Sequence, residues 1–234
     1  MPIVRILLVL LALASPLSMA GGAAAGPFED AQAAYGRSDH ATALRLWRPL
    51  ADQGNAAAQY ALGFMYDRGQ GVPKNHAEAA KWWRLAADQG NTFAQFNLGA
   101  LYDDGKGVPQ NKAEALKWYH LAAERGNDQA QFNVGVLHFA GVAVPENRAE
   151  ATKWFRRAAD QGHLGGQVYL ALSYATGLGV PQDNVQAYMW LSLAAARGDQ
   201  DAVSNRNKVA KKMTPAQIAE AQKLAGEWKQ KPER

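Results

Sequence analysis

Gly69-Gln70-Gly71-Val72-Pro73 is the first of four related pentapeptides that follow one another at a constant spacing of 36 residues. The others are Gly105-Lys106-Gly107-Val108-Pro109, Gly141-Val142-Ala143-Val144-Pro145 and Gly177-Leu178-Gly179-Val180-Pro181. Tryptophan keeps the same period, at Trp82, Trp118, Trp154 and Trp190. A fixed period of roughly 20–50 residues is the signature of a repeat array, in which each unit packs against its neighbours. The sequence therefore predicts a solenoid.

Each unit is expected to begin with one helix. In the first unit, Ala58, Leu62 and Tyr66 recur in steps of four and so share one face of a helix over roughly residues 56–68. The pentapeptide then ends this helix, because glycine adopts the left-handed conformation past a helix end and proline cannot donate the next backbone hydrogen bond.

A second helix completes the unit. Its apolar residues in the first unit form a helical stripe of Ala79, Trp82, Trp83, Ala86 and Ala87. We expect it to begin at an asparagine N-cap, in the four units at Asn75, Asn111, Asn147 and Asn184. Helices of about 13 residues do not persist alone in water, so stacking must supply the stability.

The phased pattern A-x-A-Q-x-x-L-G-x-x-Y-x-x-G-x-G-V-P, then E-A-x-x-W and A-A-x-x-G, resembles the Sel-1-like repeats, a subfamily of tetratricopeptide-like helical hairpins. The resemblance covers about residues 27–199 and implies an all-α, right-handed α-solenoid of helix-turn-helix repeats. The first unit carries the pattern in full, at Ala58, Gln59, Leu62, Gly63, Tyr66, Gly69, Gly71, Val72, Pro73, Glu78, Ala79, Trp82, Ala86, Ala87 and Gly90. Later units depart from it at His138, Ala143, Ala171 and Gln186.

The two ends of the chain differ from the array. Arg5 precedes a short apolar run, and Ser18-Met19-Ala20 offers small residues at a cleavage site, which predicts a secretory signal peptide rather than a membrane span. The chain has no cysteine, which excludes a lipid-modified N-terminus and disulfides. We expect a signal peptide at 1–20, a linker at 21–26, a divergent N-terminal hairpin at 27–55, repeats at 56–91, 92–127, 128–163 and 164–199, C-terminal capping helices at 200–230 and a tail at 231–234.

The sequence shows no pattern typical of an active site. It lacks S-x-x-K, G-x-S-x-G, H-E-x-x-H and P-loop motifs. Its histidines lie in different repeats without ligand spacing, at His40, His76, His120, His138 and His163. We therefore expect no catalytic residue, no metal and no cofactor. Because some cysteine-rich relatives of the resembled family have been linked to penicillin binding or hydrolysis, a cell-wall or penicillin-interacting enzyme remains the alternative.

One surface is a candidate for binding. The tetratricopeptide register places a stripe of each first helix on the concave wall of the array. The candidate groove residues are Tyr60, Phe64, Asp67, Phe93, Phe96, Asp103, Asp104, Phe132, Val136 and Phe139, and Val168 and Leu172 continue the stripe. Exposed aromatics there would form an apolar groove for a partner. Alternatively, tight curvature buries them between neighbouring first helices. The aspartates predict an apolar partner segment with basic residues.

The expected function is that of a non-enzymatic protein–protein interaction scaffold or adaptor with a protein or peptide partner. Export predicts a periplasmic or secreted location with no stable membrane anchor after signal cleavage, and the resemblance suggests roles in envelope signalling or secretion. Lysines near the C-terminus are interrupted by Glu220 and Glu227, so we expect no nucleic-acid partner. A peptidoglycan- or carbohydrate-binding module is a further alternative.

Overall fold

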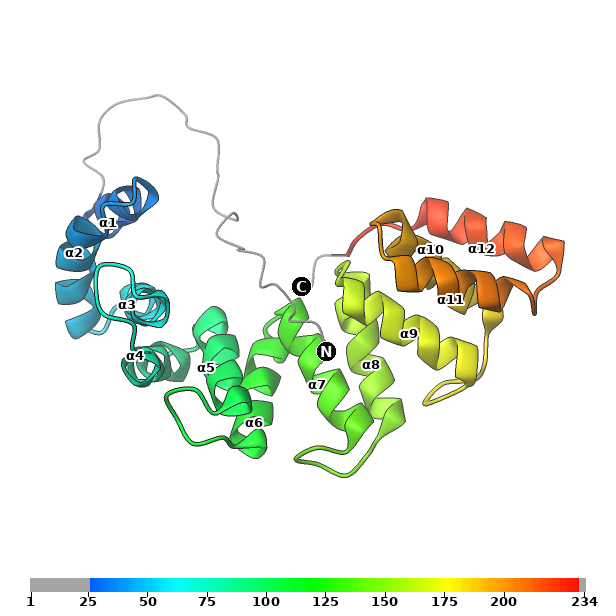
Figure 1. Ribbon diagram of the computed structural model, residues 1–234, viewed down its shortest axis with the longest axis horizontal. Helices are drawn as coiled ribbons and strands as arrows, with labels where there is room; N and C mark the ends of the chain where they lie inside the picture. The colour runs from blue at the N-terminus through cyan, green and yellow to red at the C-terminus, as the bar shows by residue number, and fades with distance from the viewer. Residues whose placement is uncertain (1–25, 232–234) are drawn as a thin grey trace.

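The computed structural model describes residues 26–231, and these residues form helices joined by short loops (Figure 1). The helices are α1 (Pro27–Gly36), α2 (His40–Asp52), α3 (Ala56–Arg68), α4 (His76–Asp88), α5 (Thr92–Asp104), α6 (Lys112–Glu124), α7 (Asp128–Ala140), α8 (Arg148–Asp160), α9 (Leu164–Thr176), α10 (Asn184–Ala196), α11 (Gln200–Ala210) and α12 (Pro215–Glu227). The predicted all-α solenoid is confirmed. The predicted signal peptide and most of the linker lie outside the described residues.

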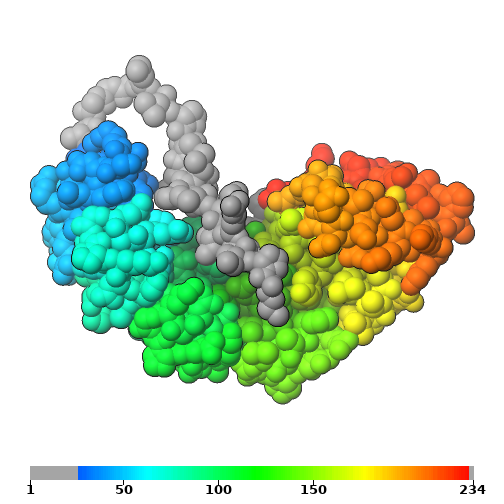
Figure 2. Space-filling view, in the orientation of Figure 1, coloured from blue at the N-terminus to red at the C-terminus, as the bar shows by residue number. Residues whose placement is uncertain are grey.

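The helix pairs stack into a crescent. Each helix packs mainly on the helices before and after it in the chain. Figure 1 shows the helix pairs following one another along the crescent, from α1 and α2 at one end to α11 and α12 at the other. The space-filling view shows a hollow between the N-terminal and C-terminal ends of the array (Figure 2).

Side-chain caps fix where the helices start. Asn75, Asn111 and Asn147 each accept hydrogen bonds from backbone N–H groups in the first turn of α4, α6 and α8, as predicted. The prediction for the fourth repeat is wrong by one residue. Asp183 caps α10 by accepting from the Gln186 N–H, and Asn184 is the first residue of the helix. Aspartate and asparagine present the same acceptor geometry, so the pattern alone did not separate them.

Glycines inside the first helices allow close packing against large rings. A Cβ atom at Gly63 would lie 2.3 Å from Cδ1 of Trp83, and one at Gly135 would lie 2.6 Å from Cε1 of Phe155. Trp118, Trp154 and Trp190 are buried, whereas Trp82 at the start of the array is partly exposed. Ring burial against a neighbouring helix therefore holds the short helices in place.

A buried glutamine joins each repeat to the preceding one. Gln59, Gln95 and Gln131 each donate from Nε2 to the backbone carbonyl of Ala51, Ala87 and Ala123, respectively, at 3.0–3.1 Å. These carbonyls lie in the last turn of the preceding second helix, where helices leave acceptors unpaired. The recurrence of glutamine in the sequence thus reflects a polar contact between repeats.

The interhelical loop of each repeat packs against the preceding repeat. A Cβ atom at Gly107 would lie 2.3 Å from the His76 carbonyl carbon, and Gly107 has a left-handed φ of 70°. Ala143 occupies the same position in the third loop and adopts the same conformation, with φ of 68°. A residue with a Cβ atom is strained in this conformation by about 1–2 kcal/mol. The third loop keeps the shape of the others at this cost.

The C-terminal end departs from the regular stacking. Both α11 and α12 pack on α10, and Thr214 and Gln217 form the predicted capping box at the start of α12. After α12 the chain turns back toward α8, where the Lys231 N–H donates to the Asp160 carbonyl at 2.8 Å. The segment Trp228–Lys231, called the C-terminal segment below, therefore lies against the last repeats.

Candidate functional site

The candidate groove residues are distributed over α3, α5 and α7, one stripe per first helix. Most of them are neither buried nor fully open. Phe93 is the exception among the aromatics, with 49% of its surface exposed. Their surroundings change along the array, so the groove has two different ends.

The open end of the groove lies between α3 and α5. Phe93, at the start of α5, contacts the ring of Tyr60 on α3 at a centroid distance of 5.9 Å. Burial raises the pKa of the Tyr60 hydroxyl, so it remains a neutral donor. Phe64, one turn along α3, has the Arg68 guanidinium 5.4 Å from its ring centre. The open end thus presents an exposed phenylalanine beside a half-buried tyrosine.

The middle of the groove is formed by Phe96 on α5 and Tyr119 on α6. Their ring centroids lie 5.7 Å apart, and Tyr119 is buried beneath Phe96. Burial and the nearby carboxylates of Asp103 and Asp104 raise the pKa of the Tyr119 hydroxyl. Phe96 therefore packs on a buried tyrosine that stays uncharged, and Phe96 itself is partly exposed.

The closed end of the groove lies between α7 and α9. Phe132 stacks on the imidazole of His163 at 4.8 Å and meets the Tyr169 ring edge-on at 5.5 Å. Phe139 packs on the same Tyr169 at 6.0 Å, and both phenylalanines contact the fully buried Phe155. Val136 packs on the same cluster. Here the stripe residues pack against a buried core and remain only partly exposed, whereas Leu172 farther along α9 is 44% exposed.

Two residues of the fourth repeat account for the closed end. In the repeat register, Tyr169 stands where the earlier repeats have Asn97 and Asn133, and His163 stands where they have Asn91 and Asn127. His163 also caps α9, because its Nδ1 accepts from the Gly166 N–H at 3.0 Å while Nε2 lies 3.1 Å from Gln129 Oε1. Burial lowers the pKa of His163, which keeps the ring neutral in this role.

The three predicted acidic residues of the groove are already paired within the chain. Asp67 lies 2.9 Å from Nδ1 of His76, Asp103 lies 2.7 Å from the Lys112 ammonium, and Asp104 lies 2.7 Å from the Lys106 ammonium. The lysines offset the charge of Asp103 and Asp104, and the Arg68 guanidinium lies 3.7 Å from the Asp67 carboxylate. The basis for expecting basic residues in a groove ligand is therefore weaker than the sequence suggested.

No cluster of metal-ligand side chains occurs within residues 26–231. The histidines of that region serve local roles instead, such as the contact of His76 with Asp67 and the cap formed by His163. In the same region, no helix is both long and apolar enough to cross a membrane.

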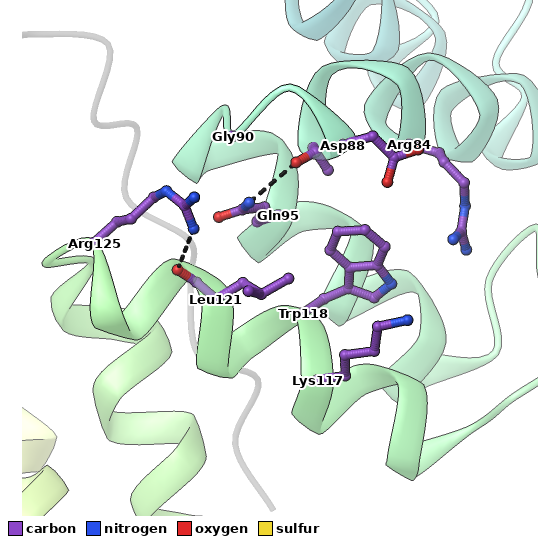
Figure 3. A pocket seen from close by; sticks show the side chains of 9 residues that line it. Arg84, Asp88, Gly90, Gln95, Lys117, Trp118, Leu121 and Arg125 are labelled. Carbon is purple, nitrogen blue, oxygen red and sulfur yellow. Dashed lines mark hydrogen bonds between the residues drawn. The ribbon is translucent and has the colours of Figure 1, made fainter.

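The structure also shows a pocket of about 320 Å³ that sequence analysis missed, formed by the second helices α4 and α6 (Figure 3). Trp118 and Leu121 form its apolar wall, and Gln95 lies at its base. Charged side chains surround it, from Arg84, Asp88, Lys117 and Arg125. Gln95 is only 2% exposed, yet its Oε1 atom has no hydrogen-bond partner within residues 26–231.

An exchange of one residue explains why this place is open. In the repeats on either side, the corresponding acceptor is paired, since Gln89 donates to Gln59 Oε1 at 2.7 Å and Gln161 donates to Gln131 Oε1 at 2.9 Å. Arg125 stands at the position of Gln89 and Gln161, and it donates instead to the Leu121 carbonyl. In the sequence, this difference appears as Arg125 at a position where the repeats on either side have Gln89 and Gln161.

A comparison with protein families finds the model described as "Sel1 repeat" in five copies, at residues 31–55, 56–91, 92–127, 128–163 and 165–199. These copies cover most of the chain, and the first lies within the hairpin that the sequence analysis treated as divergent. No curated protein gives a match in a sequence comparison.

Among solved structures, the chain is similar to a Sel1 repeat protein from Oxalobacter formigenes, with 31% identity, a TM-score of 0.75 and coverage of 86% of this chain and 85% of that one. A second structure is c5321, a protective antigen of uropathogenic Escherichia coli strains with an SLR fold. It shows 29% identity and a TM-score of 0.49, and the match covers 86% of this chain and 53% of that one.

Proposed function

The chain belongs to the Sel1 repeat family, and on that premise we propose that it is a protein–protein interaction scaffold that binds an extended segment of a partner at the open end of its groove. Sel1 repeats generally mediate protein–protein interactions, and the proteins that carry them are generally non-enzymatic scaffolds. The family alone does not select a surface, so the proposal needs support from the residues themselves.

The observation that supports this surface is the exposure of Phe93. An aromatic ring with half its surface in water gains free energy when a partner covers it, by roughly 25 cal/mol for each Å² of apolar area removed. Tyr60 beside it adds a second aromatic ring. Interfaces draw much of their energy from a few such aromatic anchors. We infer an apolar partner segment.

Selection of binders from a displayed peptide library tests this surface. Peptides enriched on the protein should lose at least about thirtyfold in affinity for Phe93→Ser, since an aromatic anchor is often worth 2 kcal/mol or more. The matched control is Leu85→Ser, because Leu85 is 48% exposed but lies on α4, outside the groove. Equal loss in both variants, or loss in neither, would remove the open end from the proposal.

We also propose that the protein is exported and works in the periplasm or outside the cell, in envelope signalling or secretion, without catalysing a reaction. Support comes from the N-terminal sequence pattern and from the family. N-terminal sequencing of the protein recovered from cells should begin at Gly21 or a few residues later. Turnover of a chromogenic β-lactam by the purified protein would contradict the non-enzymatic part of the proposal.

A further inference from the structure

The pocket between α4 and α6 has a counterpart two repeats later, between α8 and α10. The residues that line the two places are identical apart from Lys117, which is replaced by Met189. Arg84, Asp88 and Gly90 correspond to Arg156, Asp160 and Gly162, and on the facing helix Trp118 and Arg125 correspond to Trp190 and Arg197. The arginines make the same contact as well, since Arg84 and Arg156 each donate to a tyrosine hydroxyl, of Tyr102 and Tyr174.

The counterpart is filled by the C-terminal segment of the chain itself. The Trp228 ring meets Trp190 edge-on at 6.1 Å. The Gln230 side chain passes over Gly162, where a Cβ atom would lie 3.4 Å from it. Lys231 donates its backbone N–H to the Asp160 carbonyl at 2.8 Å and places its ammonium 3.4 Å from the Asp160 carboxylate. An aromatic residue and a lysine three positions later thus hold an extended segment in this site.

None of residues 26–231 lies in the α4/α6 pocket as the C-terminal segment lies in its counterpart. At the place of Asp160, two other repeats have carboxylates paired within the chain, Asp52 with Arg48 and Glu124 with Arg157. Among the described residues, no cation lies within ion-pair distance of Asp88. The Arg125 guanidinium lies near Gly90, whereas its counterpart Arg197 donates to the Gly162 carbonyl beside the bound segment. The α4/α6 pocket therefore has the same binding groups as the filled site.

We propose that the α4/α6 pocket is a second binding site, which holds an extended segment of a partner protein with the pattern aromatic-x-x-lysine. The aromatic ring packs on Trp118, the lysine ammonium pairs with Asp88, and the lysine N–H donates to the Asp88 carbonyl, as in the filled counterpart. The partner is a different protein, because the chain's own C-terminal segment is already bound in its own last repeats. This site is separate from the groove and does not depend on the function proposed above.

Lys117 is the one difference that bears on affinity. Its ammonium lies 5.4 Å from the Trp118 ring centre and 3.8 Å from Glu114 Oε2. It stands at the position of Met189, which belongs with Trp190 to the buried cluster against which Trp228 packs. A basic ligand meets a like charge there, so the α4/α6 pocket holds the segment less tightly than its counterpart does. Replacing Lys117 by methionine reproduces the lining of the filled site.

The test uses an acetylated, fluorescently labelled peptide with the sequence of residues 226–231, Gly-Glu-Trp-Lys-Gln-Lys, added to the purified full chain. Binding measured by fluorescence polarisation should saturate at one peptide per chain. A peptide with alanine in place of tryptophan should bind at least about thirtyfold more weakly. Asp88→Asn should weaken binding about two- to fivefold, as expected for an exposed ion pair. Lys117→Met should strengthen it.

Arg125→Gln is the decisive variant. It restores the glutamine found at 89 and 161, so it should pair with Gln95 Oε1, close the pocket and abolish binding while leaving helical circular dichroism unchanged. Asp52→Asn is the matched control, in the repeat that is already closed, and should have no effect. Unchanged affinity in Arg125→Gln overturns the proposal.

Two further outcomes overturn it in distinguishable ways. If Asp160→Asn changes the affinity and Asp88→Asn does not, the peptide is displacing the C-terminal segment from its own site. If the full chain forms a dimer that Asp88→Asn dissociates in sedimentation, the occupant is a second copy of this chain rather than another protein. Loss of library peptides in Phe93→Ser leaves this test unaffected, so the two proposals fail independently.

Discussion

The open and closed ends of the groove have the same backbone, but the aromatic side chains of the stripe differ in exposure between the two ends. At the open end, Phe93 is half exposed and rests on Tyr60 alone among aromatic rings. At the closed end, Phe132 is enclosed by His163, Tyr169 and Phe155. The helices are of equal length and equal register in both places. Phe96 stands at the register position of Phe132 but has Asn127 and Asn133 in place of His163 and Tyr169. Two side chains of the following repeat therefore distinguish the middle of the groove from its closed end.

Among the variants that test this comparison, Phe155→Ala is expected to change the free energy of unfolding most. Phe155 is fully buried beneath the closed end, in contact with Phe132, Phe139 and Tyr169. Removal of its ring should lower the free energy of unfolding by about 3–5 kcal/mol. Urea unfolding followed by circular dichroism measures this loss. A change below 1 kcal/mol would mean that the closed end is not a core.

Tyr169→Asn should open the closed end at a smaller cost. It restores the residue of the second and third repeats and removes ring contacts with Phe132, Phe139 and Phe155. Each aromatic contact is worth roughly 0.5–1.5 kcal/mol, so we expect a loss of about 1.5–4.5 kcal/mol in the free energy of unfolding. The reciprocal variant Asn133→Tyr should cover Phe96. If stability is unchanged in Tyr169→Asn, the closure of this end has another cause.

Phe93→Ser should leave stability nearly unchanged, because the side chain is half exposed in the folded chain. Surface substitutions usually change the free energy of unfolding by less than about 0.5 kcal/mol. Urea unfolding of Phe93→Ser and Phe155→Ala under the same conditions compares the losses in free energy of unfolding at the two ends. A loss above 2 kcal/mol would show that Phe93 is a core residue and that the groove has no open end.

The smallest effect is a pH dependence confined to the closed end. Burial lowers the pKa of His163 from its ordinary value of 6.5, and the Arg197 charge adds to this while the Asp128 carboxylate opposes it. The unfolded chain then binds a proton more readily than the folded one. His163 therefore contributes its full stability above pH 6.5 and loses it as the pH falls toward the lowered pKa of the folded state.

His163→Asn isolates this contribution. Asparagine forms the same cap at Asn55, Asn91 and Asn127 but does not titrate. The variant should lose less stability than the natural chain when the pH is lowered from 7.5 to 5. Parallel pH profiles of the melting temperature for the two proteins would contradict the role assigned to His163.

The helices and their boundaries could be predicted from the sequence because each depends on local signals that recur in phase. Asn75 as a cap and Gly69 as a helix end are examples, and both are confirmed. The exposure of Phe93 and Phe132 could not be predicted, because each ring belongs to one repeat and its cover to the next. Phe96 and Phe132 share one position in the register, and the later exchange from Asn133 to Tyr169 separates them, whereas Phe93 corresponds to Gln129.

The α4/α6 pocket was missed for a related reason. Sequence analysis used the residues that agree between repeats, which report the shared fold. Arg125 is informative because the equivalent positions hold Gln89 and Gln161. Its effect is that the Gln95 Oε1 atom lacks the glutamine donor found in those repeats, which only the structure shows. In a repeat protein, departures from the period are the better guide to sites, once the period has established the fold.

Ala143 gives the array a point of mechanical weakness. Its loop, which joins α7 to α8, carries strain that the equivalent loops avoid with Gly71, Gly107 and Gly179. In a chain of units coupled only to their neighbours, stored strain lowers the cost of a break at that link. Thermal opening should therefore divide the crescent near this loop into two blocks, with amide hydrogens around Ala143 exchanging earlier than those around Gly107.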